Sequence, residues 1–404
     1  MNLVRVSVET FIYIIFTAMA FAVSEVRESR YFYIQVAIEF VMLLSLLLFR
    51  MASNKKIYID RKLVKMLFVF LLPEILLHIW GTFRGISAET EYFVFTENFS
   101  IYFPILIAFF AVVIFGTKAT DYTIVALTIG VVIKSLVTIF MNGFAGWGVV
   151  FAPTLEGDFP LEFSDPVLVL SYIFAYMYIR KKNERIKNNP LILFTLILFF
   201  FLGRKRIILL SFFSAMIWFF FVDKISDLKK KRLACNITSI GMVIFAFIYL
   251  ALLSGVGNFY NIIEALDLNL SGRDYFYRAM AQWYDFSPTF WGIGKNVTFG
   301  LMQNEYSYFG IKAIHNDFLK IFIENGFLAF ILWEIYTFIY MPSIEKKYSK
   351  ECYLPIFVAI NIVMFVLYLS DNTNTYFICR LFYTMIVMTY ICKARSSKLQ
   401  KTVV

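Results

Sequence analysis

The sequence predicts an all-α polytopic membrane protein, with about 12 transmembrane helices in a single integral membrane domain over residues 1–404. Three observations predict this class. The composition is 60% hydrophobic and only 16% charged, which is too apolar for one soluble core. The apolar residues come in repeated runs, and roughly 20 such residues cross a bilayer. The runs are continuous rather than alternating, so we expect helices, which satisfy their own backbone polar groups in lipid.

The expected spans fall before and after one long polar stretch. Nine apolar runs precede it, at 8–23, 31–49, 63–80, 101–115, 122–140, 166–179, 190–202, 207–222 and 236–253. Three runs follow it, at 318–341, 353–369 and 376–392. The tenth run begins directly after Asn316-Asp317, two residue types that favour helix starts. The four cysteines lie singly at helix ends or inside helices, so they suggest neither a disulfide framework nor a metal knuckle.

The distribution of basic residues predicts the orientation. With the N-terminus in the cytoplasm, 25 of the 38 lysines and arginines fall in cytoplasmic segments and ten fall outside. This asymmetry predicts that both termini are cytoplasmic and that the connection between helices 9 and 10, residues 255–317, is one long extracytoplasmic loop. The net charge of +10 is therefore explained by topology and contact with anionic lipid. Nothing in the sequence calls for nucleic acid.

One tight turn departs from this pattern. Gly203-Arg204-Lys205-Arg206 joins two apolar runs, and the span count places the turn outside, where a basic cluster is unfavourable for insertion. A functional interpretation is an anion site at the outer leaflet, because guanidinium groups bind phosphate oxygens bidentately. The alternative is a miscounted span, which would leave the turn in the cytoplasm.

The long polar stretch is the expected place for chemistry. It contains Ser271-Gly272-Arg273, then Gly292-Ile293-Gly294, then His315-Asn316-Asp317, and the chain re-enters an apolar run through Glu324-Asn325-Gly326. The span count puts Arg273 and His315 on the same side as the basic turn. Aromatic residues crowd the stretch; they suit sugar rings, although an ordinary interfacial belt explains most of them.

These motifs, in this order, resemble the C-terminal half of the Wzy-type O-antigen polymerase and O-antigen ligase superfamily. The arginine-bearing turn two helices upstream is similar to the arginine that opens that region of the family. This chain has Gly203-Arg204-Lys205-Arg206 where the family has a Ser-Arg-Gly-like turn, so either Arg204 or Arg206 could take that role.

The resemblance implies transfer of an undecaprenyl-pyrophosphate-linked oligosaccharide at the outer face of the bacterial cytoplasmic membrane, without metal or other cofactor. His315 would accept the proton of the acceptor hydroxyl, because imidazole is mainly neutral at pH 7. Arg204 or Arg206, together with Arg273, would balance the charge growing on the leaving pyrophosphate. Arg380 is a further candidate pyrophosphate contact. The alternative for His315 is an interfacial histidine that caps the tenth helix.

Several polar residues within spans have structural alternatives. Glu74 and His78 lie four residues apart and share a helix face, which suits a buried polar pair lining a cavity or packing helices. Lys320 and Glu324 have the same spacing and could pair with each other. Arg380 could instead be the partner of Asp371.

The expected function is polymerisation of lipid-linked repeat units, as in capsule or lipopolysaccharide synthesis, with a flippase and a chain-length regulator as further expected partners. A ligase that passes the glycan to a lipid or protein acceptor would share almost every residue. A flippase or transporter would place its site at mid-membrane between repeated halves, and no such repeat is present in the sequence. Metal-dependent transfer is disfavoured because the chain has no Asp-x-Asp pair.

Overall fold

The computed structural model describes residues 7–23, 30–85, 91–151, 164–184, 194, 206–265, 273–309, 313–348 and 353–401, which form helices joined by turns and contain no β-strand. The longer helices are α1 (Val8–Val23), α2 (Arg30–Ala52), α3 (Arg61–Arg84), α4 (Glu91–Phe115), α5 (Ala119–Phe151), α6 (Ser164–Glu184), α8 (Arg206–Asp223), α9 (Leu228–Leu253), α13 (Asp317–Glu334), α15 (Leu354–Tyr368) and α16 (Phe377–Lys401). Each expected apolar run on described residues coincides with one of these helices, except that the run 318–341 continues from α13 through a π-helix, Ile335–Tyr340, to the start of α14 (Met341–Tyr348). The run at 190–202 lies outside the described residues except for Phe194.

Within the described residues, six helical segments are long and apolar enough to cross a membrane. They are Phe32–Ala52, Arg61–Arg84, Glu97–Lys134, Leu228–Leu253, Asp317–Tyr348 and Phe377–Ala394. Three shorter helices, Val8–Val23, Ile207–Asp223 and Leu354–Tyr368, are also apolar. The structure thus confirms the all-helical class for the described chain, whereas the number of 12 spans and the cytoplasmic placement of the termini stay predictions.

Helices α15 and α16 form the centre of the bundle. Every residue of α15 is buried, and nearly all of α16 up to Ala394 is buried as well. α16 packs against α4 and α6, while α15 packs against α8 and α9. Both helices carry buried polar side chains that need protein partners in lipid: Asn361 of α15 accepts from the Tyr383 hydroxyl of α16 at 2.8 Å, and Arg380 of α16 pairs with Glu74 of α3. These contacts explain why the two helices lie inside the bundle.

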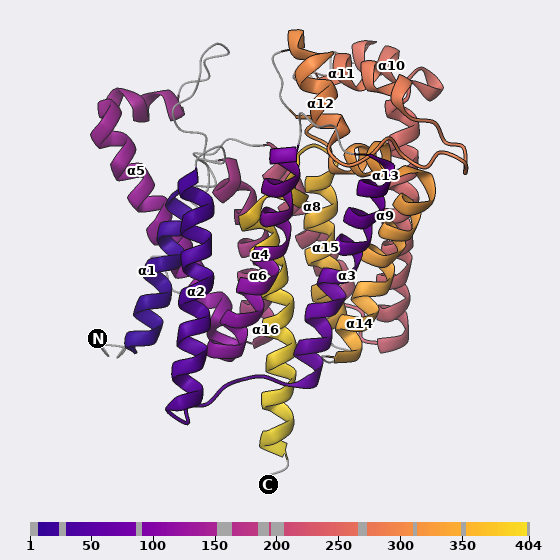
Figure 1. The fold of residues 1–404 in the computed structure, drawn as a ribbon. Coiled ribbons are helices and arrows are strands. Elements are labelled where there is room, and N and C mark those ends of the chain that lie inside the picture. The colour runs from indigo at the N-terminus through magenta and orange to yellow at the C-terminus, as the bar shows by residue number, and fades with distance from the viewer. Residues whose placement is uncertain are drawn as a thin grey trace.

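The polar stretch and the chain termini mark opposite ends of the bundle (Figure 1). The short helices α10, α11 and α12 cover one end, and the start of α1, the end of α16 and the connection between α2 and α3 lie at the other. α9 runs from the basic segment 224–232 to the covered end, so this basic segment also lies at the end that holds the termini. Three basic segments that the sequence analysis assigns to the cytoplasm, 50–65, 224–232 and the end of α16, thus lie at one end of the bundle. The polar stretch lies at the other end.

Candidate active site

The predicted loop 255–317 folds into a cap of short helices. These are α10 (Phe259–Ala265), α11 (Arg273–Met280) and α12 (Val297–Asn304), which Figure 1 shows together at one end of the bundle. Ser271 and Gly272 lie outside the described residues. The chain leaves the cap at the start of α13, whose first residue is Asp317. Its position outside the membrane on the extracytoplasmic side stays a prediction.

His315 stands at the junction between the cap and α13. Its φ of 48° is in the left-handed region, which non-glycine residues rarely adopt and which in proteins clusters at functional sites. The helix cap is its neighbour Asn316, whose Oδ1 accepts a hydrogen bond from the Leu319 N–H at 3.0 Å. The alternative in which His315 itself caps the helix is therefore wrong. Its side chain is free of that task and is 35% exposed.

An acidic side chain faces the His315 imidazole. Nδ1 of His315 lies 3.4 Å from Oδ1 of Asp371, a buried carboxylate in the connection between α15 and α16. The same oxygen accepts hydrogen bonds from the Tyr376 hydroxyl at 2.5 Å and from the Asn372 N–H at 2.9 Å. These bonds fix Asp371, and a fixed carboxylate at Nδ1 selects the tautomer that leaves Nε2 without a proton.

Arg273 and Tyr277, on α11, also contact this junction. Arg273 donates from Nη1 to the Ser370 carbonyl, next to Asp371. The Tyr277 hydroxyl donates to the His315 carbonyl at 3.3 Å. Burial, partly offset by the Arg273 charge, raises the pKa of Tyr277 to about 12, so this hydroxyl stays protonated and keeps donating at neutral pH. The structure thus brings Arg273 to the same connection as His315.

The other expected arginines are placed differently. Arg380 is buried and forms an ion pair with Glu74 at 2.8 Å. It also donates to Oδ1 of Asn374. The ion pair that the structure gives Arg380 is thus with Glu74 rather than with Asp371, and its expected contact with pyrophosphate stays a prediction. Arg204 lies outside the described residues, and Arg206 begins α8 with a side chain that is not described.

The two glycine motifs meet where α13 is interrupted. Gly326 has φ 83° and ψ 179°, which breaks the helix. The segment at Gly292 supplies replacement hydrogen bonds: the Ile293 N–H donates to the Ile323 carbonyl at 3.0 Å, the Gly294 N–H to the Glu324 carbonyl at 3.1 Å, and the Phe327 N–H to the Phe290 carbonyl at 2.8 Å. The loop thus supplies hydrogen-bond partners that the break in α13 removes, as an interrupted helix in a membrane protein requires.

No side chain fits at either glycine. A Cβ on Gly292 would lie 2.4 Å from the Glu324 carbonyl oxygen, and a Cβ on Gly326 would lie 2.3 Å from the carbonyl carbon of Trp291. Indole Nε1 of Trp80, on α3, donates to the Asn325 carbonyl at 2.9 Å. The loop, the interrupted helix and α3 are therefore joined at one point.

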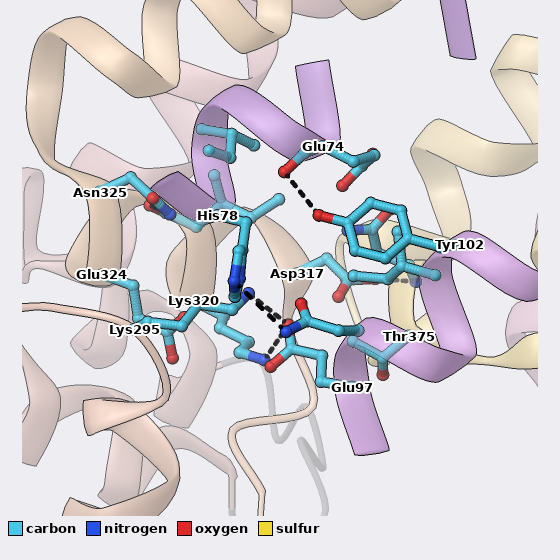
Figure 2. A pocket seen from close by; sticks show the side chains of 15 residues that line it. Glu74, His78, Glu97, Tyr102, Lys295, Asp317, Lys320, Glu324, Asn325 and Thr375 are labelled. Atoms are coloured by element: carbon cyan, nitrogen blue, oxygen red, sulfur yellow. Dashed lines mark hydrogen bonds and ion pairs between the residues drawn. The ribbon is translucent and has the colours of Figure 1, made fainter. Parts of the chain in front are cut away.

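A polar cavity lies beside the first two turns of α13 (Figure 2). Glu97, on α4, binds two lysines there: its Oε1 is 2.8 Å from Nζ of Lys295 and 2.9 Å from Nζ of Lys320. The Glu324 carboxylate accepts a hydrogen bond from the Thr298 hydroxyl. The ion pair that the structure gives Lys320 is thus with Glu97 rather than with Glu324. The cavity is lined by Glu74, Leu77, His78, Glu97, Asn98, Ile101, Tyr102, Lys295, Asp317, Lys320, Ile321, Glu324, Asn325, Asn374 and Thr375.

Glu74 and His78 both line this cavity, as their shared helix face predicts. Each has its own partner: Glu74 binds Arg380, and Nε2 of His78 lies 3.5 Å from Nδ2 of Asn98. Sequence reasoning missed Glu97 and Lys295. Glu97 precedes the expected run 101–115 and begins the apolar segment Glu97–Lys134, so an acidic residue at the edge of a run was the available signal. In the part of the chain that the structure describes, no group of three or more histidine, cysteine, aspartate or glutamate side chains is arranged to hold a metal ion. Metal independence stays a prediction.

Comparison with known proteins gives one family for part of the chain. Residues 191–333 match the Wzy_C family model, described as O-antigen ligase. The matched segment includes Arg204, Arg206, Arg273 and His315, and ends before Arg380. The match supports the resemblance to the O-antigen ligase superfamily that the motifs indicate, and it does not distinguish polymerases from ligases. No curated protein and no solved structure matches the chain.

Proposed function

We propose that this protein is a polysaccharide polymerase of the bacterial cytoplasmic membrane. It transfers undecaprenyl-pyrophosphate-linked oligosaccharide repeat units onto a lipid-linked acceptor at the outer face of that membrane, without a metal ion or cofactor. The observation that carries the proposal is the His315 junction. A partly exposed imidazole facing a fixed carboxylate lies within the segment that matches the O-antigen ligase family model.

In the proposed reaction an acceptor hydroxyl attacks the anomeric carbon of the donor sugar. The new glycosidic bond forms as the bond from that carbon to the pyrophosphate oxygen breaks, and undecaprenyl pyrophosphate leaves with the electron pair. The hydroxyl proton passes to Nε2 of His315, while Nδ1–H points at Asp371, whose negative charge stabilises the imidazolium that forms. Asp371 thus acts as a positioning residue for His315.

The leaving pyrophosphate requires positive charge. We assign this role first to Arg273, and the support is its hydrogen bond to the carbonyl of Ser370, the residue next to Asp371. Its planar guanidinium suits bidentate contact with phosphate oxygens. Arg204 or Arg206 completes the charge in this proposal, since the family match includes both. We assign Arg380 a lesser part, because Glu74 already neutralises it.

The ligase reading assigns the same residues and differs only in the acceptor. A deletion strain separates the two. Loss of a polymerase leaves single repeat units capping the acceptor, whereas loss of a ligase leaves long chains on the carrier lipid. Normal glycan length and attachment in the deletion strain would contradict both. A flippase would instead leave repeat units on the cytoplasmic face.

Complementation of the deletion strain tests the proposed role of His315 as general base. The deletion strain is complemented with wild type or with His315→Ala, and membrane insertion of each is checked by immunoblot of the membrane fraction. We expect wild type to restore long polymer and His315→Ala to restore none, because general base catalysis contributes about 10²- to 10⁴-fold. Long polymer from an inserted His315→Ala protein would remove the proposed role of this residue.

A further inference from the structure

The cavity of Figure 2 holds polar atoms that have no partner among the described residues. Oε2 of Glu97, Oδ1 of Asn98 and Oδ1 of Asn325 are buried and accept no hydrogen bond. The Glu97 side chain is 9% exposed and Asn325 is 4% exposed, so bulk water does not serve these atoms. Buried polar groups without partners lower stability, and in native proteins such groups call for an explanation such as a ligand.

The surroundings fix which amide atom of Asn325 is left without a partner. Its Nδ2 donates to the Ile321 carbonyl at 3.1 Å, and a carbonyl can only accept, so the amide oxygen is the atom left unpartnered. Glu97 has its other oxygen bound to Lys295 and Lys320. Among the described residues, the cavity therefore presents three unpartnered acceptors and one unpartnered donor, Nδ1 of His78, because Nε2 of that ring accepts from Nδ2 of Asn98. A matching ligand must both donate and accept, as a hydroxyl group does.

The charges of the cavity disfavour a phosphate. Although two lysines line it, both bind the single carboxylate Glu97. Three other carboxylates, Glu74, Asp317 and Glu324, line the same space, and Arg380 pairs with Glu74 alone. Phosphate oxygens are acceptors and carry negative charge, so they would meet unpartnered acceptors and an excess of carboxylates. Sugar hydroxyls are neutral and donate.

We propose that this cavity binds hydroxyl groups of the glycan substrate rather than its diphosphate, an inference that rests on the proposed function. The space admits one or two water-sized groups, which suits a sugar hydroxyl or hydroxymethyl substituent. Asp317 lines the cavity two residues after His315, so the same turn of chain links the two places. A sugar anchored here is held beside the His315 junction while its diphosphate stays outside the cavity.

Substitution kinetics test the inference with purified protein in lipid and lipid-linked repeat units. The variants are Asn325→Ala and Asn98→Leu, the second at a half-buried position where folding is less at risk. The matched control is Asn361→Ala, a buried asparagine that binds the Tyr383 hydroxyl at 2.8 Å and does not line the cavity. We expect KM for the lipid-linked repeat to rise about two- to tenfold in both variants, the effect of one lost hydrogen bond, and to stay unchanged in the control.

The transfer activity of the wild-type protein distinguishes failure of this inference from failure of the proposed function. If wild type extends the repeats and both variants keep the wild-type KM, the inference is overturned and the proposed function stands. If wild type transfers no glycan, the proposed function itself fails.

A direct view comes from cryo-electron microscopy of His315→Ala bound to the lipid-linked repeat. We expect a sugar oxygen within hydrogen-bonding distance of Oδ1 of Asn325. A phosphate at that place, or ordered water only, would overturn the inference.

Discussion

Substitution of Gly326 by alanine perturbs the contact between the interrupted helix and the loop at Gly292. The backbone of Gly326 has φ 83° and ψ 179°, a region open essentially to glycine, and forcing another residue into it costs about 1 to 3 kcal/mol. The new Cβ would lie 2.3 Å from the Trp291 carbonyl carbon and 2.4 Å from the Gly292 nitrogen, which are backbone atoms that cannot rotate away. The loop must therefore move.

Movement of the loop weakens the three backbone hydrogen bonds that join it to α13. Each such bond contributes about 0.5 to 1.5 kcal/mol, so the loss, together with the backbone cost, reaches about 3 to 7 kcal/mol. Hydrogen exchange followed by mass spectrometry measures the loss of local stability, in peptides that cover the Ile293, Gly294 and Phe327 amides. We expect these amides to exchange much faster in Gly326→Ala.

Gly241 provides the matched control. It lies inside α9, with nothing within 4 Å of an added Cβ, so Gly241→Ala is expected to be neutral or to stabilise by up to about 1 kcal/mol. Wild-type amide protection in Gly326→Ala, with thermal stability equal to that of Gly241→Ala, would refute the interlocked arrangement.

Three further substitutions test other parts of the site. Asp371→Asn keeps the shape but loses the carboxylate at Nδ1 of His315, so chain extension should fall by up to about 10⁴-fold, as for the same change in a Ser-His-Asp triad, with partial rescue by glutamate; an unchanged rate would exclude the positioning role. Glu74→Gln leaves Arg380 buried without its counter-charge, which should cost about 3 to 5 kcal/mol. A thermal unfolding midpoint equal to wild type would show that this ion pair adds no stability. Arg273→Lys keeps the charge but loses the planar fork, so donor use should weaken, and an unchanged donor KM would argue against bidentate contact.

The helical architecture was predictable because the signal is local. Continuous apolar runs locate helices without knowledge of their neighbours, and every run on described residues became a helix. The start of α13 was predictable for the same reason, since Asn316 and Asp317 are residues that favour helix starts. The cap formed by the short helices α10, α11 and α12 was not predictable, because these helices fall in a stretch with no long apolar run.

The site was predictable in its residues and not in its pairings. His315 and Arg273 stand in motifs of fixed order, but the partner of His315 comes from a connection 56 positions further along the chain. The two glycine motifs show the same limit, because each is an ordinary turn signal until the fold docks one into the other. Lys320 and Glu324 have the spacing of a helical pair, yet Glu97 on another helix takes the lysine. Pairings between distant segments depend on packing, which local patterns do not encode.

Extension of lipid-linked repeat units by the purified protein in lipid vesicles, with a chelator present, is the most direct measurement of the central claim. We predict that wild type converts single repeats to polymer under these conditions and that His315→Ala, folded in the same vesicles, does not. Equal polymer from both proteins, or polymer from wild type only after a divalent ion is added, would contradict the account.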